Sequence, residues 1–264
     1  MKLDALQVEI RQRSVGQTVA VAGRMLQHRP LPLLLAWLAY SLPLVALALG
    51  MTLTLEINVW WSWVLLLLVA PLFSLPLVAT CGHLVFSPTV DLNAIFRNTL
   101  RRTLPFLLLL TLLRVMVILG FLALIVPGLY LWRGSWFLGP IVALEGTSLG
   151  SSLRRARHFA AGFQGLATLH AFNGATLLIY LTTALAAVGH FMVGILGLNM
   201  AVIGDLTRHD LYEHLLAMIA FALSAPFVTT IWFFVYLEVR TRKEGWDLEI
   251  AFRDKARQLE SRRG

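Results

Sequence analysis

Two arginines lie inside long apolar runs of this sequence, where a charged side chain is costly in a lipid bilayer. Arg114 follows Leu104, the start of one run, by ten residues, which is about 15 Å along a helix and therefore near the bilayer midplane. A guanidinium at that depth can bind the carboxylate or phosphate of a ligand, or it can satisfy backbone carbonyls within the bundle. Arg133 lies near the start of the next apolar segment and closer to the outer surface, where we expect its side chain to extend to the interface.

Other polar residues in or beside the apolar runs are possible partners of Arg114. They are Glu145, His170, Asn173 and Tyr180. With Arg114 and Arg133, the first three form our set of candidate ligand-binding residues. The sequence does not decide which of them face one another.

The patterns of known metal and nucleotide chemistry are missing. His209-Asp210 and Glu213-His214 do not match H-E-x-x-H, because glutamate does not follow the first histidine and no second histidine stands at i+4. The chain also has no P-loop, no G-x-S-x-G and no G-x-G-x-x-G. We therefore expect no metal site, no cofactor and no catalytic residues, and we expect that the protein is not an enzyme.

Composition indicates that the elements carrying these residues lie in lipid. Of 264 residues, 58% are hydrophobic and only 14% are charged, unlike a soluble globule. The net charge of +8 comes from basic residues between the apolar runs, a distribution typical of membrane topology rather than of nucleic-acid binding. A single cysteine, Cys81, excludes an intrachain disulfide.

Apolar runs predict an all-α membrane protein with a six-helix transmembrane bundle. Five runs are long enough to span: Leu31–Leu55, Val59–Thr80, Leu104–Val126, Leu166–Val188 and Leu215–Leu237. The sixth, Leu129–Leu144, is short and interrupted, but counting it as a crossing places 19 of the 22 Lys and Arg residues on one side. This predicts a bacterial inner-membrane protein with both termini in the cytoplasm. Pro127-Gly128 is expected to form the outer turn between the third and fourth helices, directly before Leu129–Leu144.

Short amphipathic stretches precede three of the runs and follow the last. The first three begin at Ser14, Thr89 and Ser148, whose hydroxyls suit N-caps, and Gln17 completes a capping box in the first. We therefore predict three pseudo-repeats of an interfacial helix plus a transmembrane hairpin. Basic residues on the interfacial helices are candidate ligands of anionic lipid headgroups: Arg24, Arg97, Arg101, Arg154, Arg155 and Arg157.

These patterns divide the chain into an N-terminal amphipathic segment (1–30), a transmembrane domain (31–238) and a C-terminal basic amphipathic tail (239–264). Two stretches carry a family resemblance: Val126-Pro127-Gly128 through Glu145-Gly146 to Arg155, and Tyr236-Leu237-Glu238-Val239-Arg240 to Glu249. They resemble uncharacterised bacterial membrane proteins related to the membrane domain of glycerophosphodiester phosphodiesterases. The catalytic barrel of those enzymes is missing, so the resemblance implies a stand-alone accessory protein without hydrolase activity.

Two functions follow as expectations. The first is a non-enzymatic scaffold or assembly protein that engages anionic membrane lipid and an unknown partner protein, but no nucleic acid. The alternative is a small transporter or lipid-handling protein with an intramembrane anion site at Arg114.

Overall fold

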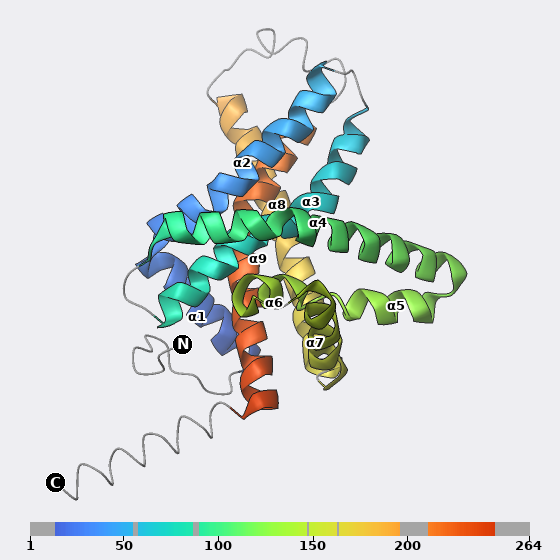
Figure 1. Cartoon of the computed structure of the whole chain (residues 1–264). Helices are drawn as coiled ribbons and strands as arrows, with labels where there is room; N and C mark the ends of the chain where they lie inside the picture. Colours follow the sequence, from blue (N-terminus) through green and yellow to red (C-terminus); the bar gives the residue numbers. More distant parts are fainter. Residues whose placement is uncertain are drawn as a thin grey trace, which may run out of the picture.

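The computed structural model describes residues 14–54, 58–86, 90–146, 148–162, 164–195 and 211–245, and these residues form nine α-helices without strands (Figure 1). In chain order the helices are α1 (Val15–His28), α2 (Pro30–Thr54), α3 (Val59–Phe86), α4 (Leu92–Ala123), α5 (Ile125–Arg133), α6 (Leu138–Glu145), α7 (Leu149–Gly162), α8 (Gln164–Ile195) and α9 (Leu211–Glu244).

Five of these helices are long and apolar enough to cross a membrane: α2, α3, α4, α8 and α9. Each overlaps one of the five long apolar runs, although the run Leu104–Val126 continues past the end of α4 into α5. Large hydrophobic side chains also remain exposed on them, such as Leu108 (64%) and Leu122 (78%) on α4, as expected of surfaces that face lipid. The predicted all-helical fold class is confirmed for the described residues, and the five apolar helices are consistent with a multi-pass membrane protein.

The sixth predicted crossing is not confirmed as a single helix. The chain over Leu129–Leu144 is divided between α5 and α6, with a turn at residues 134–137. In this turn the Ser135 hydroxyl donates to the Trp132 carbonyl at 2.5 Å, and Gly134 ends α5. Neither α5 (9 residues) nor α6 (8 residues) reaches the roughly 20 residues that a membrane span requires.

The predicted turn at Pro127-Gly128 was wrong by three residues. The chain reverses at Leu124, which is extended (φ −162°, ψ 146°), and Pro127 lies in the first turn of α5, where its missing N–H is no loss. Gly128 instead permits close helix packing, because a Cβ there would lie 2.5 Å from Cγ of Phe121 on α4. The glycine joins α4 to α5 rather than turning the chain.

Two long hairpins, α2–α3 and α8–α9, make up much of the bundle, and α3 and α9 form its centre. In the most apolar stretch of each helix, 61% of the residues are buried in α3 and 56% in α9, whereas none are buried in α8. In Figure 1, α4 runs across α8 and α9, and its second half extends with α5 away from the other helices. The α4–α5 hairpin is therefore packed mainly against itself and at its base.

The three N-caps predicted from hydroxyl residues, for α1, α4 and α7, have different outcomes. Ser14 caps α1 in the predicted capping box with Gln17. The cap of α4 is Asp91, whose carboxylate accepts from the Ala94 N–H at 3.0 Å, while the predicted Thr89 lies outside the described residues. Ser148 directly precedes α7, but its hydroxyl bonds that of Ser151. The carboxylate of Asp91, two residues later, takes the role expected of the Thr89 hydroxyl.

Candidate functional site

Segments far apart in the sequence meet at one end of the bundle, which we call the basic end. It comprises α1, the first half of α4, the end of α6, α7 and the end of α9, and three sets of contacts join them. The Thr18 hydroxyl of α1 reaches the Glu238 carboxylate of α9 at 3.5 Å. Arg102 of α4 donates to the Val142 carbonyl of α6 at 2.7 Å.

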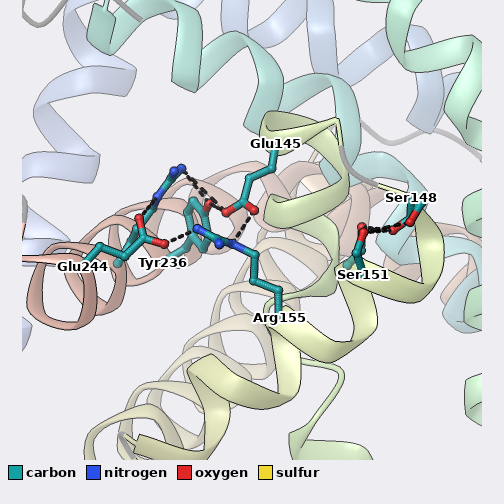
Figure 2. Close-up of polar contacts among 8 residues, drawn as sticks. Glu145, Ser148, Ser151, Arg155, Tyr236 and Glu244 are labelled. Atoms are coloured by element: carbon teal, nitrogen blue, oxygen red, sulfur yellow. Dashed lines mark hydrogen bonds and ion pairs between the residues drawn. The ribbon is translucent and has the colours of Figure 1, made fainter.

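The third set of contacts is a network that we call the paired cluster: Glu145, Arg155, Tyr236, Arg240 and Glu244 (Figure 2). Arg155 of α7 forms ion pairs with Glu145 at the end of α6 and with Glu244 at the end of α9. Arg240 donates to Glu244 at 2.7 Å, and the Tyr236 hydroxyl donates to Glu145 at 2.7 Å. The two carboxylates and two guanidiniums balance in charge.

Burial gives this cluster a structural role. The side chain of Glu145 is only 6% exposed and Tyr236 is fully buried. The Tyr236 hydroxyl donates to Glu145 while it accepts from Arg240 at 3.2 Å, and Arg155 lies over the Phe159 ring at 5.1 Å. A buried carboxylate is tolerated only when it is paired and hydrogen-bonded, and Glu145 is both. The cluster therefore fastens α6, α7 and α9 together.

A second buried carboxylate, Glu238, lies where α1 packs on α9. It is 4% exposed and pairs with Arg242 one turn later at 2.5 Å. The Thr18 hydroxyl, which donates to the Ser14 carbonyl at 3.1 Å, lies 3.5 Å from this carboxylate. Lys243 adds a bond to the His158 carbonyl of α7. The helix α9 runs unbroken through these residues, so the predicted domain boundary after residue 238 falls inside a helix.

Beyond these pairs, the basic end carries cations that are exposed and meet no carboxylate among the described residues. They are Arg24, Arg29, Arg97, Arg101, Arg154 and Arg157. Five of the six candidate headgroup residues are in this set. The sixth, Arg155, is half-buried and held by Glu145 and Glu244, so it belongs to the paired cluster rather than to the exposed basic surface.

Arg114 lies elsewhere, on the wall of a groove of about 580 Å³ that we call the Arg114 groove. Its guanidinium donates to the Leu67 carbonyl of α3 at 2.6 Å. In a regular helix that carbonyl accepts from the residue four positions later, which here is Pro71 and has no N–H. Arg114 thus replaces the hydrogen bond that the proline removes.

Aromatic and aliphatic side chains make up most of the groove. Trp132, Trp136 and Trp232 follow one another edge to face, with ring centroids 5.1 and 6.1 Å apart. The Trp232 indole N–H is already used, because it donates to the Trp136 carbonyl at 2.8 Å. Among its described lining residues, the groove therefore offers hydrocarbon and ring surfaces with one cation.

The structure separates the candidate ligand-binding residues. Glu145 binds Arg155 and Tyr236 in the paired cluster, and among the described residues no carboxylate pairs with Arg114. Tyr180 is 68% exposed on α8. The side chains of Arg133, His170 and Asn173 lie outside the described part of the chain. Within that part, no group of three or more His, Cys, Asp or Glu side chains is placed to hold a metal ion.

Several residues that make these contacts were not among the candidates predicted from the sequence, although their helical spacing indicates that they share a face. Arg102 shares the buried face of α4 with Ile95, Thr99 and Phe106, at steps of three and four residues. Tyr236, Arg240 and Glu244 stand four apart on α9. The spacing indicates a shared face, but not which other helix supplies the partners.

Comparison with known proteins adds no further assignment, since no family model, curated protein or solved structure matches the chain.

Proposed function

We propose that the protein is a non-enzymatic accessory or scaffold protein of a bacterial inner membrane, which engages anionic lipid through its basic end and positions a partner protein there. One observation carries the proposal. The exposed arginines of α1, α4 and α7, which lie far apart in the sequence, are on segments held at one end of the bundle by Glu145, Glu238 and Arg102. Such a surface attracts anionic headgroups.

This arrangement also supports the proposed topology. The basic residues of α1, the first half of α4, α7 and the end of α9 lie at one end of the bundle, so the chain that leaves through α4 returns to its starting face by the end of α6. Under the positive-inside rule that face is cytoplasmic, whether α5 and α6 complete a sixth crossing or only re-enter. We also propose three pseudo-repeats. The similar order α1–α2–α3 and α7–α8–α9 supports the first and the third, whereas in the second the interfacial stretch and the membrane run form one continuous helix, α4.

The resemblance to stand-alone relatives of the phosphodiesterase membrane domain belongs to the same proposal. The two stretches that carry it supply Glu145 and Arg155 on one side and Tyr236 and Arg240 on the other, so both contribute to the paired cluster. Charge balance in that cluster supports a structural role and gives no reason to expect catalysis.

Lipid selectivity at the basic end tests the proposal. The protein is reconstituted in phosphatidylcholine, and electron paramagnetic resonance compares the immobilised fractions of spin-labelled phosphatidylglycerol and phosphatidylcholine. We expect a preference for phosphatidylglycerol that weakens with salt and falls several-fold in Arg154→Gln/Arg157→Gln, since each basic residue near a surface contributes about 1 kcal/mol. Arg154→Lys/Arg157→Lys, which keeps the charges, retains the preference. If the preference of the Gln variant is unchanged and independent of salt, the proposed binding of anionic lipid at the basic end is contradicted.

The partner part has a separate test in native lipid nanodiscs. Mass spectrometry of the purified particles is expected to find one protein in stoichiometric amount, reduced when residues 246–264 are deleted. Recovery of the chain with lipid alone would remove the scaffold role and leave only lipid binding.

A second candidate, a transporter or lipid-handling protein, is favoured by a different observation, the cation that Arg114 places in the wall of an apolar groove.

A further inference from the structure

The Arg114 groove has the size and position of a binding site. Its volume of about 580 Å³ falls within the range of roughly 300–1,000 Å³ that is typical of ligand pockets. Residues of α3, α4, α5, α6 and α9 line it, together with the turn between α5 and α6. Ligand sites in helical membrane proteins are commonly built between helices in this way.

Charge gives the groove its chemistry. Arg114 has several N–H donors, and the Leu67 carbonyl is the acceptor that the described residues supply to it. A carbonyl satisfies a donor but does not neutralise the charge. A guanidinium stays protonated, and in a low-dielectric region an unneutralised cation strongly favours an anionic partner. Within the described part of the chain, the groove therefore lacks one negative group beside Arg114.

The walls restrict what can carry that negative group. Ser74 donates to the Pro71 carbonyl at 2.6 Å and Ser135 to the Trp132 carbonyl at 2.5 Å, so both hydroxyl donors are already used inside the protein. The rest of the lining is largely apolar, including Phe106, Leu110 and Trp136. A small hydrated anion would lose its water against this surface, whereas a hydrocarbon chain that comes from the bilayer enters it without a desolvation cost.

We propose that the Arg114 groove binds a single-chain amphiphile with an acidic head group, its carboxylate or phosphate on Arg114 and its hydrocarbon chain along Trp132, Trp136 and Trp232. The proposal rests on the second candidate function and names its ligand class. A free fatty acid and a lysophosphatidate share this chemistry. The basic end is not involved, so its lipid selectivity is independent of the outcome here.

A purely structural role for Arg114 makes a different prediction. If its only task is to satisfy the carbonyl freed by Pro71, then a variant that restores a backbone N–H at position 71 dispenses with the guanidinium. Pro71→Ala/Arg114→Gln is such a variant, and it should fold even if Arg114→Gln alone does not. This double variant distinguishes an effect on ligand binding from an effect on folding.

The test is photoaffinity labelling of the full chain in phosphatidylcholine nanodiscs. Three probes carry a diazirine in the same alkyl chain: a fatty acid, a lysophosphatidate and a neutral monoacylglycerol. We expect one or both acidic probes to label residues 113–121 or 132–140, with competition by the unlabelled acid, and the relative yields identify the head group. The monoacylglycerol should label these segments weakly.

Two variants complete the test. Labelling should fall about tenfold in Pro71→Ala/Arg114→Gln, the loss expected for one charge-assisted hydrogen bond. It should also fall in Val117→Trp, which fills the groove while keeping Arg114. The spin-label selectivity of the basic end should stay unchanged in both. Equal labelling by the neutral probe, or undiminished labelling of the double variant, overturns the proposal.

Discussion

In the paired cluster, Arg155 and Arg240 meet the carboxylates of Glu145 and Glu244, whereas in the groove Arg114 meets a backbone carbonyl. The charges of the first arrangement are balanced, and its side chains join three helices. The second satisfies a hydrogen bond but leaves a charge without a counter-ion among the described residues. The partners of an arginine in an apolar bundle therefore indicate its role. An arginine whose charge is balanced by carboxylates has a structural role, whereas an arginine without a counter-ion beside a groove is a candidate for binding an anionic ligand.

The largest effect is expected when the charge balance of the paired cluster is removed. Glu145→Gln removes one carboxylate and leaves Arg155 and Arg240 to share Glu244, so we expect the free energy of unfolding to fall by about 3 kcal/mol. Because both arginines are partly exposed, we expect the loss of unfolding free energy to lie at the lower end of the range for a broken buried ion pair. Unfolding in mixed SDS–detergent micelles measures it.

Glu244→Gln is the matched control for that variant. The side chain of Glu244 is 24% exposed, against 6% for Glu145, and water can replace part of its contacts. We expect a loss of about 1 kcal/mol. Equal effects of the two substitutions would show that burial does not decide the role of the cluster.

A second change tests the groove without touching its charge. In Gly128→Leu a side chain must enter the space held by Phe121, which spreads the α4–α5 hairpin, and overpacking of this kind costs about 2 kcal/mol. Because Phe121 and Trp132 also line the groove, acidic-probe labelling should fall as well. Unfolding and labelling yields are measured together.

Gly50→Ala is its control, since a Cβ at Gly50 meets nothing within 4 Å. Alanine in the interior of α2 should leave labelling intact and stability equal or slightly higher. Loss of labelling in both glycine variants would mean that labelling reports general loosening of the bundle.

The smallest expected effect separates the two tasks of Arg114. A double-mutant cycle compares Arg114→Gln in the presence of Pro71 and in the Pro71→Ala background, where the Leu67 carbonyl regains a helical donor. We expect a loss of about 1.5 kcal/mol when Pro71 is present and less than about half of that in the Pro71→Ala background. Identical losses would show that Arg114 acts on stability by another route than the freed carbonyl.

Much of the architecture was predictable, because hydropathy is a local property. Five apolar runs became the five long helices, and the capping box at Ser14 formed as expected. The turn before α5 was misplaced because Pro-Gly is a strong turn signal, while the close approach of Gly128 to Phe121 is invisible until two helices are packed. The sequence shows that Arg114 lies in an apolar run, but only the structure shows that its guanidinium meets the carbonyl freed by Pro71, 43 residues earlier.

The apolar helices, their short amphipathic neighbours and the segregation of basic residues between them follow from local sequence, because each depends on the order of side chains along one segment. Tertiary structure alone decided that Glu145 pairs with Arg155 and not with Arg114, and that Arg114 lines a groove walled by three tryptophans. Pairing depends on the packing of α3, α4, α6, α7 and α9 against one another. Helical spacing names the face that a residue shares, but only packing decides what lies opposite that face.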